Sequence, residues 1–236
     1  MNQEADLIRQ RLTTPRAAAI AGIIFSVLLI VSMLLIRTSI PENPLAAATD
    51  AIKHSRRISL ALNLLPFAGI SFLWFVGVLR DRLGQLEDRF FATVFLGSAL
   101  LFLAMIFIVG SVAGGMVTLL ASGSESLLGS SAYALGRIQA YQAMHTYAIK
   151  MAGLFMISTS MISLRTAIVP RWMAFLGIAL ALMLLLSVGA FEPILLVFPL
   201  WVLSISVYIL FDNFRGAFRT AAHPGGSAAT RRRPWP

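Results

Sequence analysis

Six long apolar runs, separated by short charged connections, constrain this chain more than any other feature. Each run comes close to or exceeds the about 20 apolar residues that an α-helix needs to cross a bilayer. The predicted spans are Ala17–Ile36, Ile58–Leu79, Phe91–Leu120, Tyr147–Leu164, Trp172–Val188 and Ile194–Phe211. Apolar residues surround most of each helix, unlike the alternating pattern of a transmembrane β-strand. The sequence therefore predicts an all-α, polytopic bundle of six spanning helices.

The composition supports a membrane environment for the whole chain. Charged residues make up 12% of the 236 residues, about half the share found in soluble domains. We expect one transmembrane domain at residues 17–211, after a cytoplasmic segment at residues 1–16. The first apolar run is longer than the about 7–15 residues of a cleaved signal sequence, which favours an uncleaved anchor. Residues 212–236 form a basic tail that we expect to be disordered.

The basic residues predict the orientation and the partners. The net charge is +9, but Lys and Arg flank the apolar runs or lie in the tail, so we expect no nucleic acid partner. Anionic lipid headgroups near the tail are the expected partners. Thirteen of the 19 Lys and Arg residues lie in segments that are cytoplasmic if the N-terminus is inside. This bias predicts an inner-membrane protein with both termini in the cytoplasm, although Arg56 and Arg57 are exceptions.

Two long connections fall on the outer side in this topology. Each contains a stretch that we expect to form an amphipathic helix at the interface, Leu45–Arg57 and Ala134–Thr146. The connection Gly189–Pro193 is short, which predicts a tight antiparallel hairpin of the last two spans.

Charged and titratable residues at the outer ends of the spans form a candidate functional cluster. His145 precedes the fourth predicted span, Lys150 lies in its first turn, and Glu192 lies in the last hairpin. We expect Glu192 to pair with Lys150 or Arg137 across the rim, contributing about 0–1 kcal/mol. The alternative is a transport role, but no Asp or Glu falls centrally in a predicted span, which disfavours ion-coupled transport.

Two further candidates complete this cluster. His54 lies on the same predicted side as His145, so a bis-histidine haem site is an alternative to two hydrogen-bonded interfacial histidines. Asn63 and Pro66 mark a polar kink in the second span, which either lines a small cavity or bonds a neighbouring helix. We expect no cofactor and no metal, and the absence of cysteine excludes thiolate sites.

Small residues at helical spacing predict close helix packing. They are Gly110, Ser111, Gly114 and Gly115 in the third span and Thr159, Ser163 and Thr166 in the fourth. Packing within the bundle is the main interpretation, and a homo-oligomer or another membrane protein as partner is the alternative.

The pattern around the fourth and fifth spans resembles a known family. His145 before a span, the small polar helix Gly153–Leu164 and the turn Val169–Trp172 are similar to a bacterial family of six-helix membrane proteins, domain of unknown function 4386. The similarity covers about Pro15–Phe211. It implies a six-helix bundle without an assigned activity, so no catalytic residues follow from it.

Three functions agree with these observations. The leading one is a non-enzymatic structural, regulatory or partner-binding bundle, because the chain carries no hydrolase elbow, zinc-binding helix or nucleotide-binding loop. The second is a small-molecule transporter or channel with a pocket near Asn63. The third is a haem- or lipid-processing membrane enzyme near His54, His145 and Glu192.

Overall fold

The computed structural model describes residues 2–39, 55–83, 89–121, 131–166, 169–187 and 192–221. These residues are helical except for Val169, Pro170 and Ser187, which confirms the all-α class. The elements in chain order are α1 (Asn2–Ser39), α3 (Ser55–Leu83), α4 (Arg89–Ala121), α5 (Ser131–Gln142), η2 (Ala143–Ala148), α6 (Ile149–Thr166), α7 (Arg171–Leu186), η3 (Glu192–Leu196) and α8 (Val197–Ala221).

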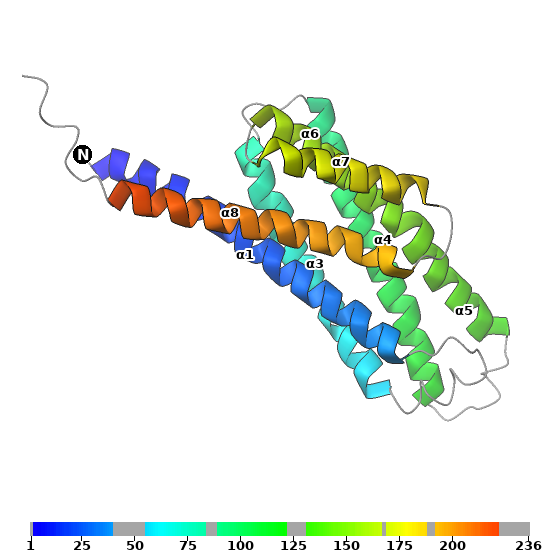
Figure 1. Cartoon of the computed structure of the whole chain (residues 1–236). Coiled ribbons are helices and arrows are strands. Elements are labelled where there is room, and N and C mark those ends of the chain that lie inside the picture. Colours follow the sequence, from blue (N-terminus) through cyan, green and yellow to red (C-terminus); the bar gives the residue numbers. More distant parts are fainter. Residues whose placement is uncertain are drawn as a thin grey trace, which may run out of the picture.

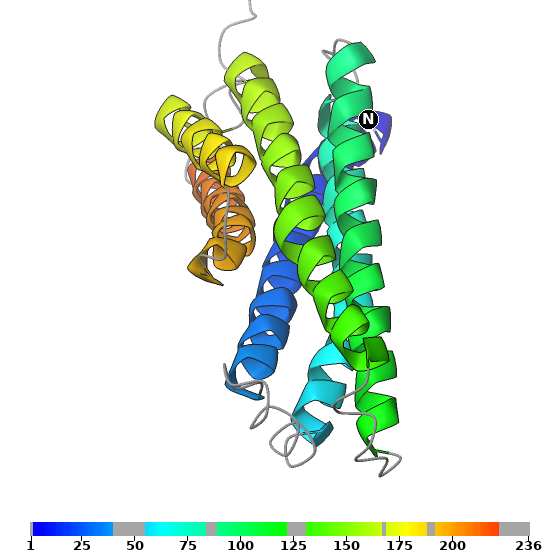
Figure 2. The same cartoon turned by 90° about the vertical axis from the view of Figure 1, so that its right-hand side faces the viewer.

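The helices pack as an antiparallel bundle (Figure 1). α1 packs along α3 and α8, while α6 packs on α4 and α7, and α3 contacts α4. The C-terminal ends of α3 and α6 meet the N-terminal ends of α4 and α7 at one end of the bundle (Figures 1 and 2). The N-terminal end of α1 and the C-terminal end of α8 point toward the same side of the bundle in Figure 1. Successive helices therefore alternate in direction, as in a chain that crosses a membrane repeatedly.

Five helical segments of the described chain are long and apolar enough to cross a membrane. They are Arg16–Ile36, Arg56–Arg80, Ala92–Thr118, Ser131–Arg165 and Pro193–Asn213. The fifth predicted span, Trp172–Val188, corresponds to α7, an apolar helix of 16 residues. At 1.5 Å per residue α7 is about 24 Å long, which is shorter than the about 30 Å of hydrocarbon in a bilayer.

The expected interfacial helix Ala134–Thr146 is not a separate element. α5 continues through η2 into α6 without a break, so this stretch extends the fourth span. α5 packs along α4, where Gly136 leaves room for Met116: a Cβ on Gly136 would lie 3.2 Å from the Met116 sulfur. The other expected interfacial helix, Leu45–Arg57, lies largely outside the described residues, and only its last three residues appear, in α3.

Two further expectations differ from the structure. The predicted tight hairpin of the last two spans is wrong, because α7 packs mainly on α6 and has few contacts with α8. The terminal helices are also longer than expected, because α1 begins at Asn2 and α8 continues to Ala221. Residues 222–236 lie outside the described part of the chain.

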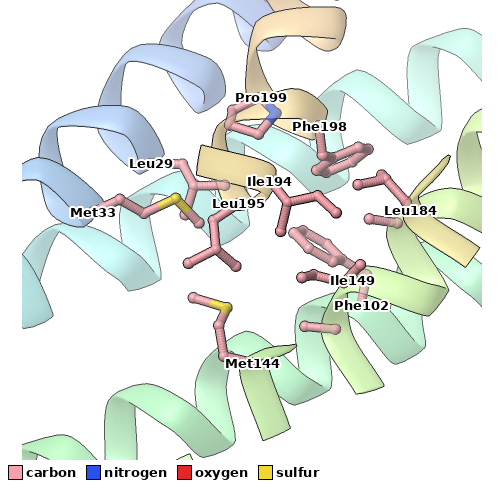
Figure 3. A pocket seen from close by; sticks show the side chains of 12 residues that line it. Leu29, Met33, Phe102, Met144, Ile149, Leu184, Ile194, Leu195, Phe198 and Pro199 are labelled. Atoms are coloured by element: carbon pink, nitrogen blue, oxygen red, sulfur yellow. The ribbon is translucent and has the colours of Figure 1, made fainter. Parts of the chain in front are cut away.

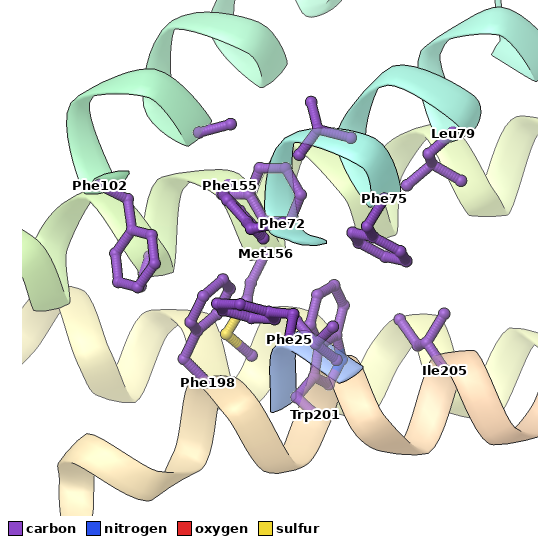
Figure 4. Packing of buried hydrophobic residues seen from close by; sticks show 14 of the residues in the cluster. Phe25, Phe72, Phe75, Leu79, Phe102, Phe155, Met156, Phe198, Trp201 and Ile205 are labelled. Atoms are coloured by element: carbon purple, nitrogen blue, oxygen red, sulfur yellow. The ribbon is translucent and has the colours of Figure 1, made fainter. Parts of the chain in front are cut away.

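Phenylalanine side chains fill the centre of the bundle (Figure 4). The cluster draws on α1, α3, α4, α6 and α8 and comprises Phe25, Phe72, Phe75, Phe95, Phe102, Phe155 and Phe198. The Phe72 ring centroid lies 4.6 Å from that of Phe25, 5.4 Å from Phe155 and 5.5 Å from Phe102. Aromatic pairs at such separations contribute about 0.5–1.5 kcal/mol each beyond area burial. Because lipid is as apolar as these side chains, close packing rather than exclusion from lipid stabilises the centre.

Small residues allow the helices to approach closely, as the sequence predicted. On α4, a Cβ added to Gly110 would lie 3.1 Å from Leu65 of α3. On α1, a Cβ on Gly22 would lie 2.8 Å from the buried Phe75 ring and would clash with Ser206 of α8. These contacts all lie within one bundle.

The hydroxyl group of Thr159 does not bond across to a neighbouring helix. Its Oγ1 donates to the Phe155 carbonyl of its own helix at 2.8 Å, and Ser158 bonds Leu154 in the same way. The hydroxyl groups of these two residues are therefore satisfied locally, and packing alone joins their faces to the neighbouring helices.

Candidate functional site

The helix that carries Lys150 changes its winding just before this residue. Residues 143–148 form a π-helix, in which the Ile149 amide donates to the Met144 carbonyl oxygen. A π-helix inserted between two α-helical segments often marks a functional site. Here it separates α5 from α6 and sets the direction of the Lys150 side chain relative to α5.

Lys150 holds the C-terminal end of α7. Its Nζ donates a hydrogen bond to the Leu185 carbonyl oxygen at 2.9 Å. The last four carbonyl groups of a helix lack partners inside the helix, and cations are favoured near them. Ser187 Oγ satisfies a second of these carbonyls, that of Leu184, at 2.9 Å. The ammonium and the hydroxyl together explain how a short helix can end inside an apolar bundle.

A close approach of α6 to α7 makes this contact geometrically possible. Gly153 lies about one turn after Lys150 on α6. A Cβ at Gly153 would lie 3.1 Å from the Ala181 carbonyl oxygen and 3.3 Å from the Leu184 Cβ. The missing side chain therefore lets the α7 backbone come within reach of the Lys150 ammonium.

The packing of α5 shows where Lys150 lies along the bundle. Tyr133 of α5 and Val117 of α4 pack around Ile58 and Leu62, near the start of α3. That start carries the exposed Arg57, and exposed arginines at helix ends mark the headgroup region. The beginning of α5 is thus level with the membrane boundary of α3, rather than lying flat beyond it.

Lys150 therefore lies near the middle of the continuous helix formed by α5, η2 and α6. At 1.5 Å per residue it is about 20 Å from Arg137 and about 22 Å from Arg165 along the same continuous helix. Both arginines are exposed, whereas Lys150 is half-buried. A half-buried charged group within a helical bundle needs a partner, and within the described residues the partner is the Leu185 carbonyl.

A small apolar cavity lies beside this contact (Figure 3). Its volume is about 20 Å³, room for about one water molecule. The lining residues are Leu29, Met33, Phe102, Met144, Ala148, Ile149, Ala152, Leu184, Ile194, Leu195, Phe198 and Pro199. The lining of this cavity includes residues of η3, the end of α7 and Ile149, the residue before Lys150. Glu192 begins η3, but its side chain lies outside the described part of the structure, so its pairing with Lys150 stays a prediction.

His145 is half-buried within the π-helix. Its Nδ1 lies 3.3 Å from the Tyr141 carbonyl oxygen, and its ring stacks on that of Tyr141 with centroids 4.1 Å apart. A carbonyl oxygen only accepts hydrogen bonds, so Nδ1 is the donor in this contact, and in the neutral imidazole Nε2 then presents a lone pair. Nε2 is buried and has no hydrogen-bond partner within the described residues.

The remaining candidates do not join Lys150 within the described structure. Asn63 is exposed on α3, and Pro66 lies inside that helix without ending it. His54 lies outside the described residues. No group of three or more His, Cys, Asp or Glu in the described part of the chain comes together to hold a metal ion.

Two buried polar groups, on Ser160 and Trp201, were not predicted from the sequence to lie close together. Ser160 of α6 and Trp201 of α8 both lie against Gly177 of α7, where a Cβ would lie 2.7 Å from the Trp201 Nε1. The Ser160 Oγ and the Trp201 Nε1 are buried without a hydrogen-bond partner in the described region. Serine and tryptophan are ordinary in a membrane span, so only the helix packing could have indicated this junction.

No protein-family model, curated protein or solved structure matches this chain. The resemblance to the six-helix bacterial family stays a prediction. The functional argument therefore depends on the geometry of this chain alone.

Proposed function

We propose that this protein is a non-enzymatic, multi-pass inner-membrane protein with a structural, regulatory or partner-binding role. In this proposal α1, α3, α4, the continuous α5–α6 helix, α7 and α8 make six crossings, of which α7 is the shortest. An even number of crossings agrees with the N-terminal end of α1 and the C-terminal end of α8 pointing toward the same side of the bundle (Figure 1). The basic residue bias then directs both termini to the cytoplasm.

The close packing of side chains at the centre of the bundle is the main support for this proposal. The side chains of Phe72, Phe75, Phe95 and Phe155 are each 0% exposed and close-packed with one another. A catalytic site needs several titratable groups within hydrogen-bond reach of one another. In the described part of the chain His145 and Lys150 instead bond backbone carbonyl groups. The bundle therefore resembles a close-packed structural protein more than an enzyme with an active-site cavity.

The topology is tested with reporter fusions after Arg219 and within residues 122–126. A cytoplasmic signal at Arg219 and a periplasmic signal at residues 122–126 are expected. A periplasmic signal at Arg219 would overturn the orientation.

The role is tested on protein extracted with its surrounding native lipid. We expect a complex of fixed stoichiometry, larger than one 25.6 kDa chain, whose added mass is a second protein or a second copy. A density map of that complex then identifies the contact surface. A monomeric particle that moves a solute across liposomes would contradict the scaffold role.

The second candidate is a small-molecule transporter, and the half-buried Lys150 favours it. Transport sites lie near the midplane and often use the ends of helices that stop inside the membrane. α7 stops in this way and its terminal carbonyl bonds Lys150. The test compares solute-dependent thermal shifts of the wild-type protein and the Lys150→Met variant, with Arg137→Met as a control for lost charge. A shift that only Lys150→Met removes supports transport, because a ligand stabilises only a protein that binds it.

A haem enzyme is the third reading of the sequence. The lone pair of His145 Nε2 is free to bind a metal, but His145 is the one histidine that the described residues include. An absorbance spectrum of the purified protein settles this reading, since bound haem gives a Soret band.

A further inference from the structure

An apolar groove runs between α7 and α8. Its volume is about 300 Å³, and its lining residues are Trp172, Met173, Leu176, Leu180, Val197, Leu200, Trp201 and Ser204. The groove exists because α7 packs on α6 while α8 packs on α1, so that the two helices touch at few points. It is therefore a consequence of the overall packing.

The groove opens to the surroundings of the bundle. The Trp172 side chain is 64% exposed, Leu200 is 48% exposed and Leu176 is 46% exposed. An exposed apolar groove of this kind marks an interaction site. Between two transmembrane helices its walls match the chemistry of an acyl chain, and it extends about 12 Å along α7 from Trp172 to Leu180 at 1.5 Å per residue.

One end of the groove is basic. Arg171 is exposed and directly precedes Trp172 at the N-terminal end of α7. That end lies beside the C-terminal end of α6, which carries the exposed Arg165 (Figure 1). Among the described residues no carboxylate lines the groove, and the exposed Asp212 lies about 12 Å further along α8 than Ser204 at 1.5 Å per residue. An indole beside an arginine at this boundary suits the level of lipid headgroups.

We propose that this groove binds an anionic phospholipid, with an acyl chain between α7 and α8 and the phosphate paired with Arg171. The apolar walls fix the chain, and the arginine selects the headgroup charge. This inference goes beyond the proposed function, because it holds whether the bundle binds a protein partner or moves a solute. It also differs from the general attraction of lipids to the basic tail, since it assigns one site.

The test uses the full chain reconstituted in vesicles that contain either brominated phosphatidylglycerol or brominated phosphatidylcholine. Bromine on the acyl chain quenches nearby tryptophan, and the difference between the wild-type protein and Trp172→Phe isolates the Trp172 signal. We expect phosphatidylglycerol to bind next to Trp172 about fivefold more tightly than phosphatidylcholine, since one basic residue near the surface contributes about that factor. Arg171→Gln should remove the preference, and Arg137→Gln at the other end of the bundle should preserve it.

A second variant tests the groove itself. Ser204→Phe fills the groove and should reduce quenching of Trp172 by both lipids, whereas Ala179→Phe, at an exposed position outside the groove, should not. Equal quenching by the two lipids in the wild-type protein would overturn the headgroup selection. Weak quenching by both would show that something other than lipid fills the groove. Neither result depends on whether the protein transports a solute or binds a partner.

Discussion

The phenylalanine cluster and the region around α7 are built in different ways. In the cluster five helices contribute large apolar side chains, and Phe72 packs against Phe25, Phe102, Phe155 and Phe198. Around α7 there is a short helix, an open groove and two buried polar atoms without partners. The first region gains stability from close packing, whereas the second depends on single polar contacts. The difference indicates that a movement related to function would begin at α7.

Burial in the two regions sharpens this contrast. On α7 the Phe175 ring is 60% exposed, and Leu186 at its end is 77% exposed. At this end Lys150 donates a hydrogen bond to Leu185, beside the buried Ala181 and Leu184, which pack against α6. Segments with few buried contacts open at a lower free energy than a packed core. We therefore expect α7 to exchange its amide hydrogens faster than α3 or α6.

Truncation of Phe72 should have the largest effect on stability. Phe72→Ala removes a fully buried ring at the centre of the cluster, and comparable core truncations lower the free energy of unfolding by about 3–5 kcal/mol. Phe175→Ala is the matched control on α7 and should change it by less than about 0.5 kcal/mol. Reversible unfolding in mixed micelles measures both. Equal losses would show that α7 is as tightly packed as the core.

Removal of the Lys150 ammonium should have the next largest effect, and a local one. Lys150→Met keeps the length of the side chain but leaves the part-buried Leu185 carbonyl without this donor, which costs about 1–3 kcal/mol. We expect faster hydrogen–deuterium exchange in residues 181–187 and unchanged exchange around Phe72. Arg137→Met, which removes an exposed charge from the same continuous helix, should leave both unchanged. If residues 181–187 keep their protection, the Lys150 contact does not hold α7.

A methyl group added to Gly22 should have an effect of similar size, through crowding. A Cβ at Gly22 meets the buried Phe75 ring, and overpacking of this kind costs about 1–3 kcal/mol. Gly77→Ala on α3 is the control, because nothing lies within 4 Å of its Cβ position. That substitution should stabilise the helix by up to about 1 kcal/mol, since alanine has a higher helix propensity than glycine. Thermal denaturation in detergent distinguishes opposite shifts, and a stable Gly22→Ala variant would show that α1 can move away from α3.

The all-α class and most of the spans could be predicted from the sequence, because the length and hydropathy of a run decide both. The continuity of α5 with α6 could not, since Arg137, Gln139 and Gln142 make that stretch polar enough to suggest an interface. The spacing of Arg137 and Arg165, which fits the about 40–45 Å thickness of a whole bilayer, was the available signal. The position of Lys150 near the middle of a continuous helix follows from this continuity.

The phenylalanine cluster and the hydrogen-bond partner of Lys150 could not be predicted from the sequence, for a different reason. Every predicted span is apolar on most sides, so hydropathy does not indicate which phenylalanines face one another. A hydrogen bond to a backbone carbonyl also has no sequence signature, because every residue has a carbonyl group. The side-chain pattern therefore predicts a carboxylate such as Glu192 as the partner of Lys150. In the structure the Lys150 ammonium instead donates to a backbone carbonyl at the end of α7.

Replacement of His145 should have the smallest effect, and its sign is informative. His145→Phe keeps a ring to stack on Tyr141 but loses the 3.3 Å contact from Nδ1, which is longer than a strong hydrogen bond and contributes less than about 1 kcal/mol. The substitution also removes the buried, unpartnered Nε2, whose desolvation costs about 1–3 kcal/mol. The second term is at least as large as the first, so the variant should be as stable as the wild-type protein or slightly more stable in a thermal denaturation experiment. A clear loss of stability would show that Nε2 bonds a group essential to the fold. A stable variant that loses its partner or ligand would instead assign His145 to the functional site, because a residue kept at a cost to stability is expected where function requires it.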